Sequence, residues 1–223
     1  MNTEAVFFDL DGTLIDTAPD MGGALNTLLV AHGRPPVAEA LYRPQVSHGS
    51  IELLKLGFPE LNPNTQLNDL RIEFLKTYER DIAVDSKLFE QMDTVLTTLE
   101  NNSIQWGIIT NKPEHLTLKL LDQLNLTSRC CSVIGADTTT HAKPHPAPMR
   151  LACQQSNVNP ERCLYIGDAL RDIQAGNAVG MTTLIAGWGY IGSTDNTNEW
   201  HADGYLQAPL DILNHLEPKI INH

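Results

Sequence analysis

The sequence has few basic residues and no long hydrophobic run. Its 223 residues include 15 lysines and arginines against 27 aspartates and glutamates, which gives a formal net charge of −12. Binding to nucleic acid requires a basic face, and no cluster of lysine and arginine occurs in the chain, so these counts argue against a nucleic-acid-binding protein. No apolar run approaches the roughly 20 residues that a membrane-spanning helix needs. We therefore expect a globular protein that binds neither nucleic acid nor membrane.

Cysteine is also scarce. The four cysteines are Cys130, Cys131, Cys153 and Cys163, and no two of them have Cys-x-x-Cys spacing. The N-terminus carries neither a basic segment nor a small-residue cleavage site. Both observations favour a cytoplasmic chain whose cysteines are buried, reduced thiols rather than members of a disulfide framework.

Short hydrophobic runs that favour β-strands recur along the chain, and segments of helical period separate the later ones. The runs are Ala5–Phe8, Gln105–Thr110, Cys131–Ile134, Cys163–Ile166 and Met181–Ile185. Such alternation predicts an α/β fold, with a Rossmann-like parallel sheet and helices on both of its faces. Ligands of open sheets of this kind bind at the carboxyl ends of the strands.

The segment after the first run has no comparable strand signal. Apolar side chains follow a helical period from Met21 to Leu29 and again from Leu67 to Ile82. We therefore predict that residues 16–84 form an inserted, all-helical cap domain, and that residues 1–15 and 85–223 form the core domain. An insert that leaves the sheet at the end of a strand is in a position to cover a ligand bound there.

The motif with the clearest chemical signal directly follows the first run. It reads Asp9-Leu10-Asp11-Gly12-Thr13, so two carboxylates lie two residues apart at the end of a hydrophobic strand. An EF-hand calcium loop would need glycine at its sixth position and glutamate at its twelfth, where this chain has Leu14 and Asp20. A helix cap or a turn aspartate explains poorly why two acids, a glycine and a threonine occur together.

This motif resembles the first motif of the haloacid dehalogenase superfamily, Asp-x-Asp-Gly-Thr at the end of a strand. The second motif of that superfamily is a hydrophobic strand that ends in serine or threonine, and it is matched by the strand that ends at Thr110. The third is a lysine, matched by Lys143. The fourth is an acidic pair after a strand, matched by Asp168 and Asp172. All four motifs occur in order between residues 9 and 172.

The resemblance implies a phosphatase in which each of these residues has a role. Asp9 would attack phosphorus and form an aspartyl-phosphate, and Asp11 would act as general acid and base. Thr110 and Asn111 would donate hydrogen bonds to the transferring phosphoryl group, and Lys143 would stabilise its charge.

The resemblance also implies a cofactor, Mg²⁺. This ion prefers a few carboxylate oxygens together with water and substrate phosphate. Its implied ligands are Asp9, the main-chain carbonyl of Asp11, and Asp168. Asp172 would hold a water molecule or Lys143 beside the ion.

Two other patterns match the spacing of functional motifs but lack the helix that each motif requires. Residues 187–192 match the dinucleotide-binding pattern Gly-x-Gly-x-x-Gly, but the polar residues 193–198 that follow have no helical period, so we predict a loop. His141 and His145 have the spacing of a metal pair on a helix, but Pro144 lies between them and would break that helix.

Two branches of the superfamily are similar to this chain. Asp16–Asp20 resembles the phosphoglycolate phosphatase branch. Five other segments resemble the bacterial N-acetylmuramic acid 6-phosphate phosphatases: Glu73–Leu75, Ala83–Val84, Ser86–Glu90, Trp106–Gly107 and Thr110–Pro113. The β-phosphoglucomutases usually have histidine at the position of Asp20, which disfavours a phosphohexomutase. Gln91 departs from the glycine that is common in relatives. A non-catalytic phosphate-binding regulatory protein is another alternative, which the intact acidic pair disfavours.

The predicted cap contains one polar, glycine-containing stretch that is a candidate for contacts with the substrate. It consists of Arg43, Ser47, His48, Gly49 and Ser50. An ordinary loop between helices, with a solvated arginine, is an equally good interpretation. The expected partner is a small phosphorylated metabolite, and the chain is expected to be a monomer or a homodimer.

Overall fold

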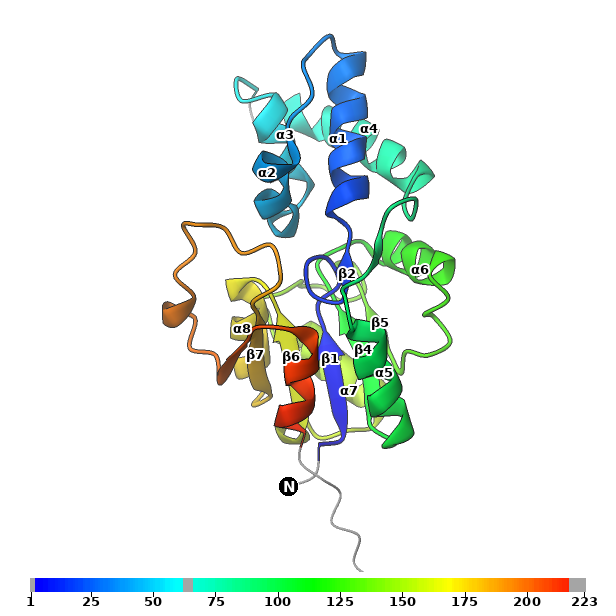
Figure 1. Cartoon of the computed structure of the whole chain (residues 1–223), viewed down its shortest axis with the longest axis vertical. Coiled ribbons are helices and arrows are strands. Elements are labelled where there is room, and N and C mark those ends of the chain that lie inside the picture. The colour runs from blue at the N-terminus through cyan, green and yellow to red at the C-terminus, as the bar shows by residue number, and fades with distance from the viewer. Residues whose placement is uncertain (1–2, 62–65, 217–223) are drawn as a thin grey trace, which may run out of the picture.

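A computed structural model describes residues 3–61 and 66–216, and a six-stranded parallel sheet lies at its centre (Figure 1). The strand order is β5-β4-β1-β6-β7-β8. Their bounds are Ala5–Phe8 (β1), Gln105–Ile109 (β4), Val133–Ile134 (β5), Cys163–Gly167 (β6), Thr182–Ala186 (β7) and Gly204–Leu206 (β8). The five predicted strands are all present, and the parallel sheet is confirmed. The short edge strand β8 was not predicted.

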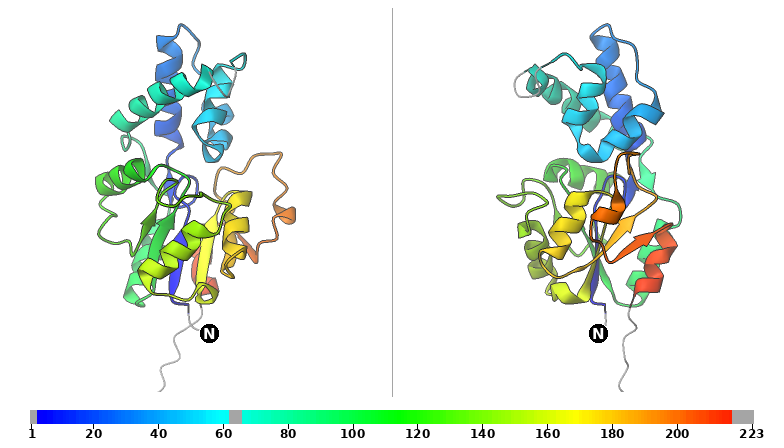
Figure 2. Two further views of the ribbon diagram at one scale, coloured as in Figure 1. Left: turned by 180° about the vertical axis from the view of Figure 1, so that it is seen from behind. Right: turned by 90° about the vertical axis from the view of Figure 1, so that its left-hand side faces the viewer.

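Helices cover both faces of the sheet, as its side-chain pattern requires (Figure 2). In β1, Val6 and Phe8 belong to one hydrophobic cluster, whereas Ala5 and Phe7 belong to another on the opposite face. The first cluster includes side chains from α5 (Met92–Asn101), α6 (Glu114–Gln123) and the 3-10 helix Pro209–His215. The second includes side chains from α7 (Ala147–Ser156) and α8 (Leu170–Asn177). A strand buried on both faces explains why β1 is hydrophobic throughout.

A layer of helices lies beyond the carboxyl ends of these strands (Figure 1). Its members are α1 (Ala18–Ala31), α2 (Glu39–Tyr42), the 3-10 helix Arg43–His48, α3 (Ser50–Gly57) and α4 (Gln66–Arg80). Pro19 occupies the first turn of α1, where a missing backbone N–H is tolerated. Apolar residues of α1 and α4 pack together in this layer.

Two short antiparallel strands connect the helical layer to the sheet. Ile15–Asp16 (β2) pairs with Lys87–Leu88 (β3), so the chain enters and leaves the layer side by side. Gln91, the residue before α5, has a φ of 67°. This left-handed conformation favours glycine, although the chain has glutamine there.

The glycine-rich segment after β7 forms turns. The next helix is the single 3-10 turn Thr197–Glu199, so the predicted loop is present. A Cβ added at Gly189 would overlap Asp168, which shows why the loop needs glycine there.

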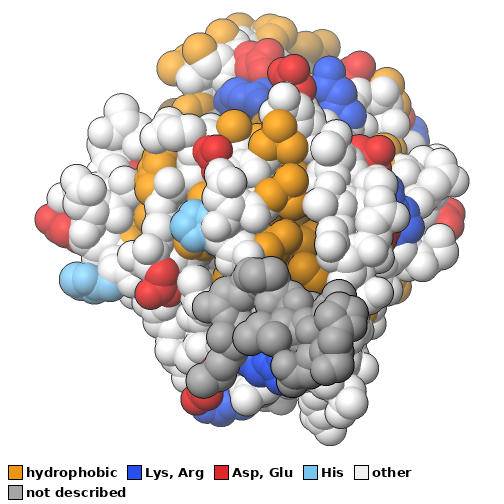
Figure 3. Space-filling view, turned by 60° about the horizontal axis from the view of Figure 1, so that its bottom comes forward, with side chains coloured by type: hydrophobic (Ala, Val, Ile, Leu, Met, Phe, Trp, Pro, Cys, Tyr) orange, Lys and Arg blue, Asp and Glu red, His pale blue; other side chains and the backbone are white. Residues whose placement is uncertain are grey.

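None of the helices that the structure describes is long and apolar enough to cross a membrane. On the face shown in Figure 3, lysine and arginine side chains are scattered among acidic ones.

Candidate active site

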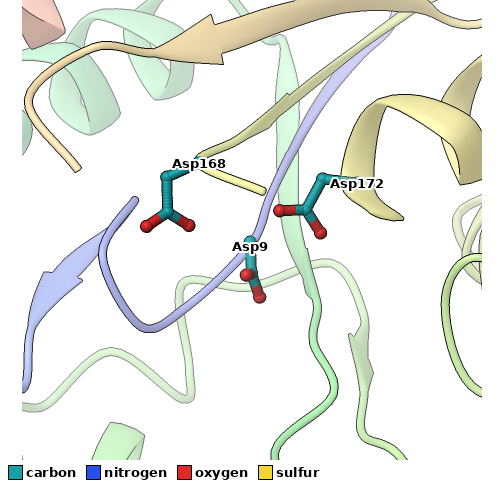
Figure 4. Close-up of side chains that lie close together, drawn as sticks. All are labelled: Asp9, Asp168 and Asp172. Atoms are coloured by element: carbon teal, nitrogen blue, oxygen red, sulfur yellow. The ribbon is translucent and has the colours of Figure 1, made fainter. Parts of the chain in front are cut away.

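Three buried aspartates meet where β1 and β6 end. Asp9 directly follows β1, Asp168 directly follows β6, and Asp172 lies in the first turn of α8. Because β1 and β6 are adjacent parallel strands, their carboxyl ends bring Asp9 and Asp168 together. One carboxylate oxygen from each aspartate lies within 4.8 Å of the others, and Figure 4 shows the three side chains close together at the strand ends.

Lys143 lies against this acidic group from the loop before α7. Its Nζ is 3.0 Å from Oδ1 of Asp9 and 2.7 Å from Oδ1 of Asp172, and its side chain is fully buried. It also donates to the carbonyl of Ile109 and the hydroxyl of Tyr165, each at 2.8 Å. The structure thus brings together residues from four separate motifs of the sequence.

The charges in this group shift the pKa values in different directions. Burial alone would raise the pKa of Asp9, but Lys143 and Arg171 outweigh burial and hold this pKa below its usual value. Burial, together with the charges of Asp9 and Asp172, raises the pKa of Asp168 to about 7. The pKa of Asp172 is raised, chiefly by burial. Asp9 is therefore the carboxylate of the three whose ionised form is favoured.

The acidic group has the composition of a site for a hard divalent cation. Burial raises the pKa values of Asp168 and Asp172 most, and repulsion from the neighbouring carboxylates raises them further. A divalent cation would relieve this repulsion, and clustered carboxylate oxygens are the ligands that Mg²⁺ prefers. Asp9 and Asp168 fit that role. Asp172 is ion-paired with Lys143, and its Oδ2 accepts from the backbone N–H of Ala169.

Asp11 points to a different partner. Its Oδ1 accepts from Nζ of Lys112 at 2.9 Å and from the hydroxyl of Thr17 at 2.6 Å. The turn that places it needs Gly12, because φ is +84° there and an added Cβ would overlap Asp168 and the ring of Tyr190. The side chain of Asp11 is therefore not one of the clustered carboxylates, and only its main chain remains a candidate metal ligand.

Thr110 and Asn111 follow β4 and lie close to Lys143 and Lys112. The hydroxyl of Thr110 accepts from the backbone N–H of Lys112 at 3.2 Å. The side-chain amide of Asn111 donates to the carbonyl of Lys143 at 2.9 Å and accepts from its backbone N–H at 3.0 Å. Asn111 therefore holds the backbone of the Lys143 loop, a role that the sequence analysis did not predict.

A cavity of about 490 Å³ separates these residues from the helical layer. Its core side includes Asp9, Asp11, Thr110, Asn111, Lys112 and Arg171, and its opposite side includes residues of the helical layer. This volume is typical of a site for a small organic molecule. A phosphoryl group on a molecule in this cavity would have access to both Asp9 and Asp11.

Four of the five residues predicted from the cap line this cavity. They are Ser47, His48, Gly49 and Ser50. Ser47 also contacts the acidic group, because its hydroxyl donates to Oδ2 of Asp168 at 2.6 Å.

Arg43 is not among the residues that line the cavity, so the structure does not bring it to the predicted position. Its guanidinium pairs with Asp16 at 2.7 Å and with Glu39 at 2.9 Å, and it lies over the ring of Tyr190.

Several other residues that line the cavity were not predicted from the sequence, and three of them carry polar groups close to the core side: Lys112, Arg171 and Tyr78. Lys112 pairs with Asp11, and Arg171 donates to the carbonyl of Ser47 at 2.6 Å. The position of Arg171 between Asp168 and Asp172 was a possible signal, because a cation there faces both acids. The third residue, Tyr78, has a buried hydroxyl with no hydrogen-bond partner among the described residues. Burial raises its pKa to about 12, so it is a neutral donor at ordinary pH.

Known proteins with similar sequences share most of this chain. A sequence model of haloacid dehalogenase-like hydrolases matches residues 3–180. A phosphoglycolate phosphatase of Xylella fastidiosa (strain Temecula1) is 44% identical over 204 residues, which cover 92% of this chain and 89% of that protein. An N-acetylmuramic acid 6-phosphate phosphatase of Pseudomonas putida is 39% identical over 213 residues, which cover 95% of each chain.

Solved structures agree on the fold. A crystal structure from Haemophilus somnus, described as a predicted phosphoglycolate phosphatase, superposes with a TM-score of 0.84 at 23% identity and covers 96% of this chain and 98% of that one. A haloacid dehalogenase-like hydrolase from Streptococcus pneumoniae has a TM-score of 0.80 at 24% identity, and covers 95% and 97% of the two chains. At such identities the likeness shows the fold alone.

Proposed function

Because this chain belongs to the family of haloacid dehalogenase-like hydrolases, we propose that it hydrolyses a phosphomonoester of a small metabolite through an aspartyl-phosphate on Asp9. The observation that carries the proposal is the position of Asp9, which lines a cavity of suitable size and lies beside Asp168, Asp172 and Lys143. Phosphomonoester hydrolysis is among the slowest uncatalysed reactions, so it requires a positioned nucleophile and strong stabilisation of charge.

The proposed reaction has two displacements at phosphorus. In the first, a carboxylate oxygen of Asp9 bonds to phosphorus while the ester P–O bond breaks, and Asp11 gives its proton to the leaving oxygen. In the second, water attacks the phospho-aspartate, Asp11 takes a proton from that water, and Asp9 is released as a carboxylate. The Lys112 ammonium, from the segment after β4, lies 2.9 Å from Oδ1 of Asp11 and so fixes the position of this side chain.

Other residues would bind and orient the phosphoryl group. Lys143 is already within 3.0 Å of Asp9, so its charge would stabilise the negative charge that develops there. We assign the hydroxyl of Thr110 as a donor to the phosphoryl oxygens. Asn111 would act mainly through Lys143, whose backbone it holds.

The cofactor in this proposal is Mg²⁺. Asp9, Asp168 and the main-chain carbonyl of Asp11 would hold it, and Asp172 would keep Lys143 in position. When bound, the ion would offset the repulsion between these carboxylates and an anionic substrate.

We also propose that residues 16–84 act as a cap domain that determines specificity, and that residues 1–15 and 85–223 are the catalytic core. The names of the relatives suggest phosphoglycolate or N-acetylmuramic acid 6-phosphate as the substrate. The environment of Asp20 does not favour the mutase alternative. Its carboxylate accepts hydrogen bonds from the backbone N–H of Asp85 and Ser86 and from the Ser86 hydroxyl, so it holds the chain that returns from the cap.

The first experiment tests turnover with p-nitrophenyl phosphate and Mg²⁺. We expect hydrolysis by the natural protein and its loss in Asp9→Asn, which keeps the size of the side chain. Circular dichroism would confirm that the variant folds. A fully active Asp9→Asn protein would contradict the covalent step, and an inactive natural protein would favour the non-catalytic phosphate-binding alternative.

The second experiment tests the metal site without relying on turnover. Mg²⁺ that binds only the folded protein raises its melting temperature. We expect this shift in the natural protein, its loss in Asp168→Asn, and its retention in Asp122→Asn, which changes an exposed aspartate on α6. Equal shifts in all three proteins would place the binding of Mg²⁺ elsewhere.

A further inference from the structure

One face of α4 forms part of the cap side of the cavity. Asn68, Arg71, Leu75 and Tyr78 all line it, and their spacing of three, four and three residues keeps them on the same side of a helix. Tyr78 lies at the inner end of this face, where Nζ of Lys112 is 4.4 Å from the centre of its ring. Arg71 lies two turns away, about 10 Å along the helix axis at 1.5 Å per residue.

Arg71 differs from the other cations of the cavity in its partners. Lys112 pairs with Asp11, and Arg171 lies among the acids of the site, where Asp172 and Asp9 raise its pKa. Within residues 3–61 and 66–216, Arg71 forms no ion pair with a carboxylate. Its Nε donates to the hydroxyl of Ser50 at 3.0 Å, and this bond fixes one edge of the guanidinium. Among the described residues, no hydrogen bond of its two terminal nitrogens is found, and these nitrogens match the two oxygens of a carboxylate.

The volume of the cavity limits which carboxylate-bearing substrates would fill it. In phosphoglycolate, three bonds separate phosphorus from the carboxyl carbon. Consecutive Cα atoms of a peptide are also three bonds apart and lie about 4 Å from each other, so we expect a similar distance between the two groups of phosphoglycolate. A molecule of that size would fill only a small part of 490 Å³. A substrate with a sugar-sized body between its two anionic groups would fill it better.

We propose that Arg71 binds a carboxylate of the substrate, and that the substrate is a phosphomonoester whose carboxylate is separated from the phosphate by a body about the size of a sugar ring. This inference rests on the proposed phosphatase function, because it assumes that the phosphoryl group is at Asp9. Arg71 is a specificity-determining residue in this scheme, and Ser50 is a positioning residue that orients its guanidinium.

The experiment compares two substrates that differ in the carboxylate. N-acetylmuramic acid 6-phosphate carries a lactyl carboxylate that N-acetylglucosamine 6-phosphate lacks. We expect the natural protein to have the higher kcat/KM for the first. We expect Arg71→Gln to lower the ratio of the two kcat/KM values by roughly 10- to 100-fold, the range for a lost hydrogen bond to a charged group. Most of this change should be in KM, since the carboxylate takes no part in the bond changes at phosphorus.

Three further variants separate this role from a structural one. Arg71→Lys keeps the charge but not the planar fork, so an intermediate ratio is expected. Ser50→Ala should lower the ratio less than Arg71→Gln does. Arg80→Gln, an exposed arginine on the same helix that pairs with Asp81, should leave the ratio unchanged. Melting temperatures would show whether any variant loses folded protein, and Arg71→Lys provides the test if Arg71→Gln does not fold.

The outcomes distinguish the two proposals. If the natural protein hydrolyses p-nitrophenyl phosphate but treats the two sugar phosphates alike, or prefers phosphoglycolate to both, the role of Arg71 is overturned while the phosphatase function stands. The same holds if Arg71→Gln lowers both kcat/KM values by one factor. If the natural protein hydrolyses none of these esters, both proposals fall.

Discussion

The ammonium of Lys112 donates to both carboxylate oxygens of Asp11, at 2.9 and 3.2 Å, although the two residues are 101 positions apart in the chain. Both side chains are largely buried, with 4% and 15% of their surface exposed. An ion pair in such a place is strongly coupled, because removal of one partner leaves the other as an uncompensated buried charge. The pair connects the end of β1 to the segment after β4.

We therefore expect Lys112→Met to lower the free energy of unfolding by about 3 kcal/mol. Asp11→Asn should also destabilise the protein, but the double variant should lose less than the sum of the two, with a coupling of about 1–3 kcal/mol. Urea denaturation of the four proteins measures this cycle. The exposed pair of Lys119 and Glu79, at 3.7 Å, is a control whose coupling should stay below about 0.5 kcal/mol. Additive effects at Lys112 and Asp11 would contradict the buried pair.

Local patterns in the sequence were sufficient to predict most of the fold. Hydrophobic runs predicted β1, β4, β5, β6 and β7, because buried strands of a parallel sheet are hydrophobic on both faces. The edge strand β8 has no such run, since the side chain of Tyr205 is exposed and Leu206 is its only fully buried side chain. The two-residue strands β2 and β3 are too short to show alternation.

The candidate site was predictable only where residues follow a strand or match a known motif. Asp9 and Asp168 follow strands, so the sheet alone predicts that they meet. Lys112 follows β4 directly after Asn111 and could have been included on that ground, whereas Tyr78 is brought to the site by tertiary packing, which no local pattern encodes. Arg43 belongs to the same polar stretch as Ser47 but pairs with Asp16 outside the cavity lining, because a polar stretch in a helical insert does not determine which way each side chain points.

Substitution of Gly12 by alanine tests the close packing of the turn between Asp9 and Asp11. The added Cβ would overlap Asp168 and Tyr190, so we expect Gly12→Ala to abolish turnover of p-nitrophenyl phosphate and the stabilisation by Mg²⁺. Gly33 is a matched control, since its φ is +69° and no atom lies within 4 Å of the added Cβ. Gly33→Ala should cost only about 1–2 kcal/mol of backbone strain and leave turnover intact. Similar losses in the two variants would mean that backbone strain, not overlap, explains the effect at Gly12.

Two buried tyrosines should respond differently to loss of their hydroxyls. The Tyr190 hydroxyl accepts from the backbone N–H groups of Thr17 and Ala18 and donates to Asp16. Tyr190→Phe should therefore lower the free energy of unfolding by about 1–3 kcal/mol. Tyr78→Phe removes a hydroxyl without a partner among the described residues, so it should leave stability equal or higher. If that hydroxyl donates to the substrate, Tyr78→Phe will raise KM. Equal destabilisation by both variants in urea would show that Tyr78 has a partner in solution.

The thiol of Cys130 should resist alkylation when the protein is folded. Burial raises its pKa to about 12, whereas an ordinary cysteine has a pKa of about 8.5. The thiolate is the reactive form, so iodoacetamide at pH 8 should modify Cys130 at least about 100-fold more slowly in the folded protein than in urea. Mass spectrometry of peptides would measure this rate for Cys130 separately from the other three cysteines.

The same shift in pKa predicts how stability depends on pH. Above about pH 8.5 the unfolded chain loses the Cys130 proton while the folded chain keeps it, so the unfolded state binds fewer protons and the free energy of unfolding falls as pH rises toward 12. Cys130→Ala lacks this contribution. The difference in stability between the natural protein and Cys130→Ala should therefore shrink between pH 8 and about pH 10.5, where both can be measured by urea denaturation. Other groups that titrate in this range affect both proteins equally. Parallel stability curves would show that the folded and unfolded states ionise Cys130 alike.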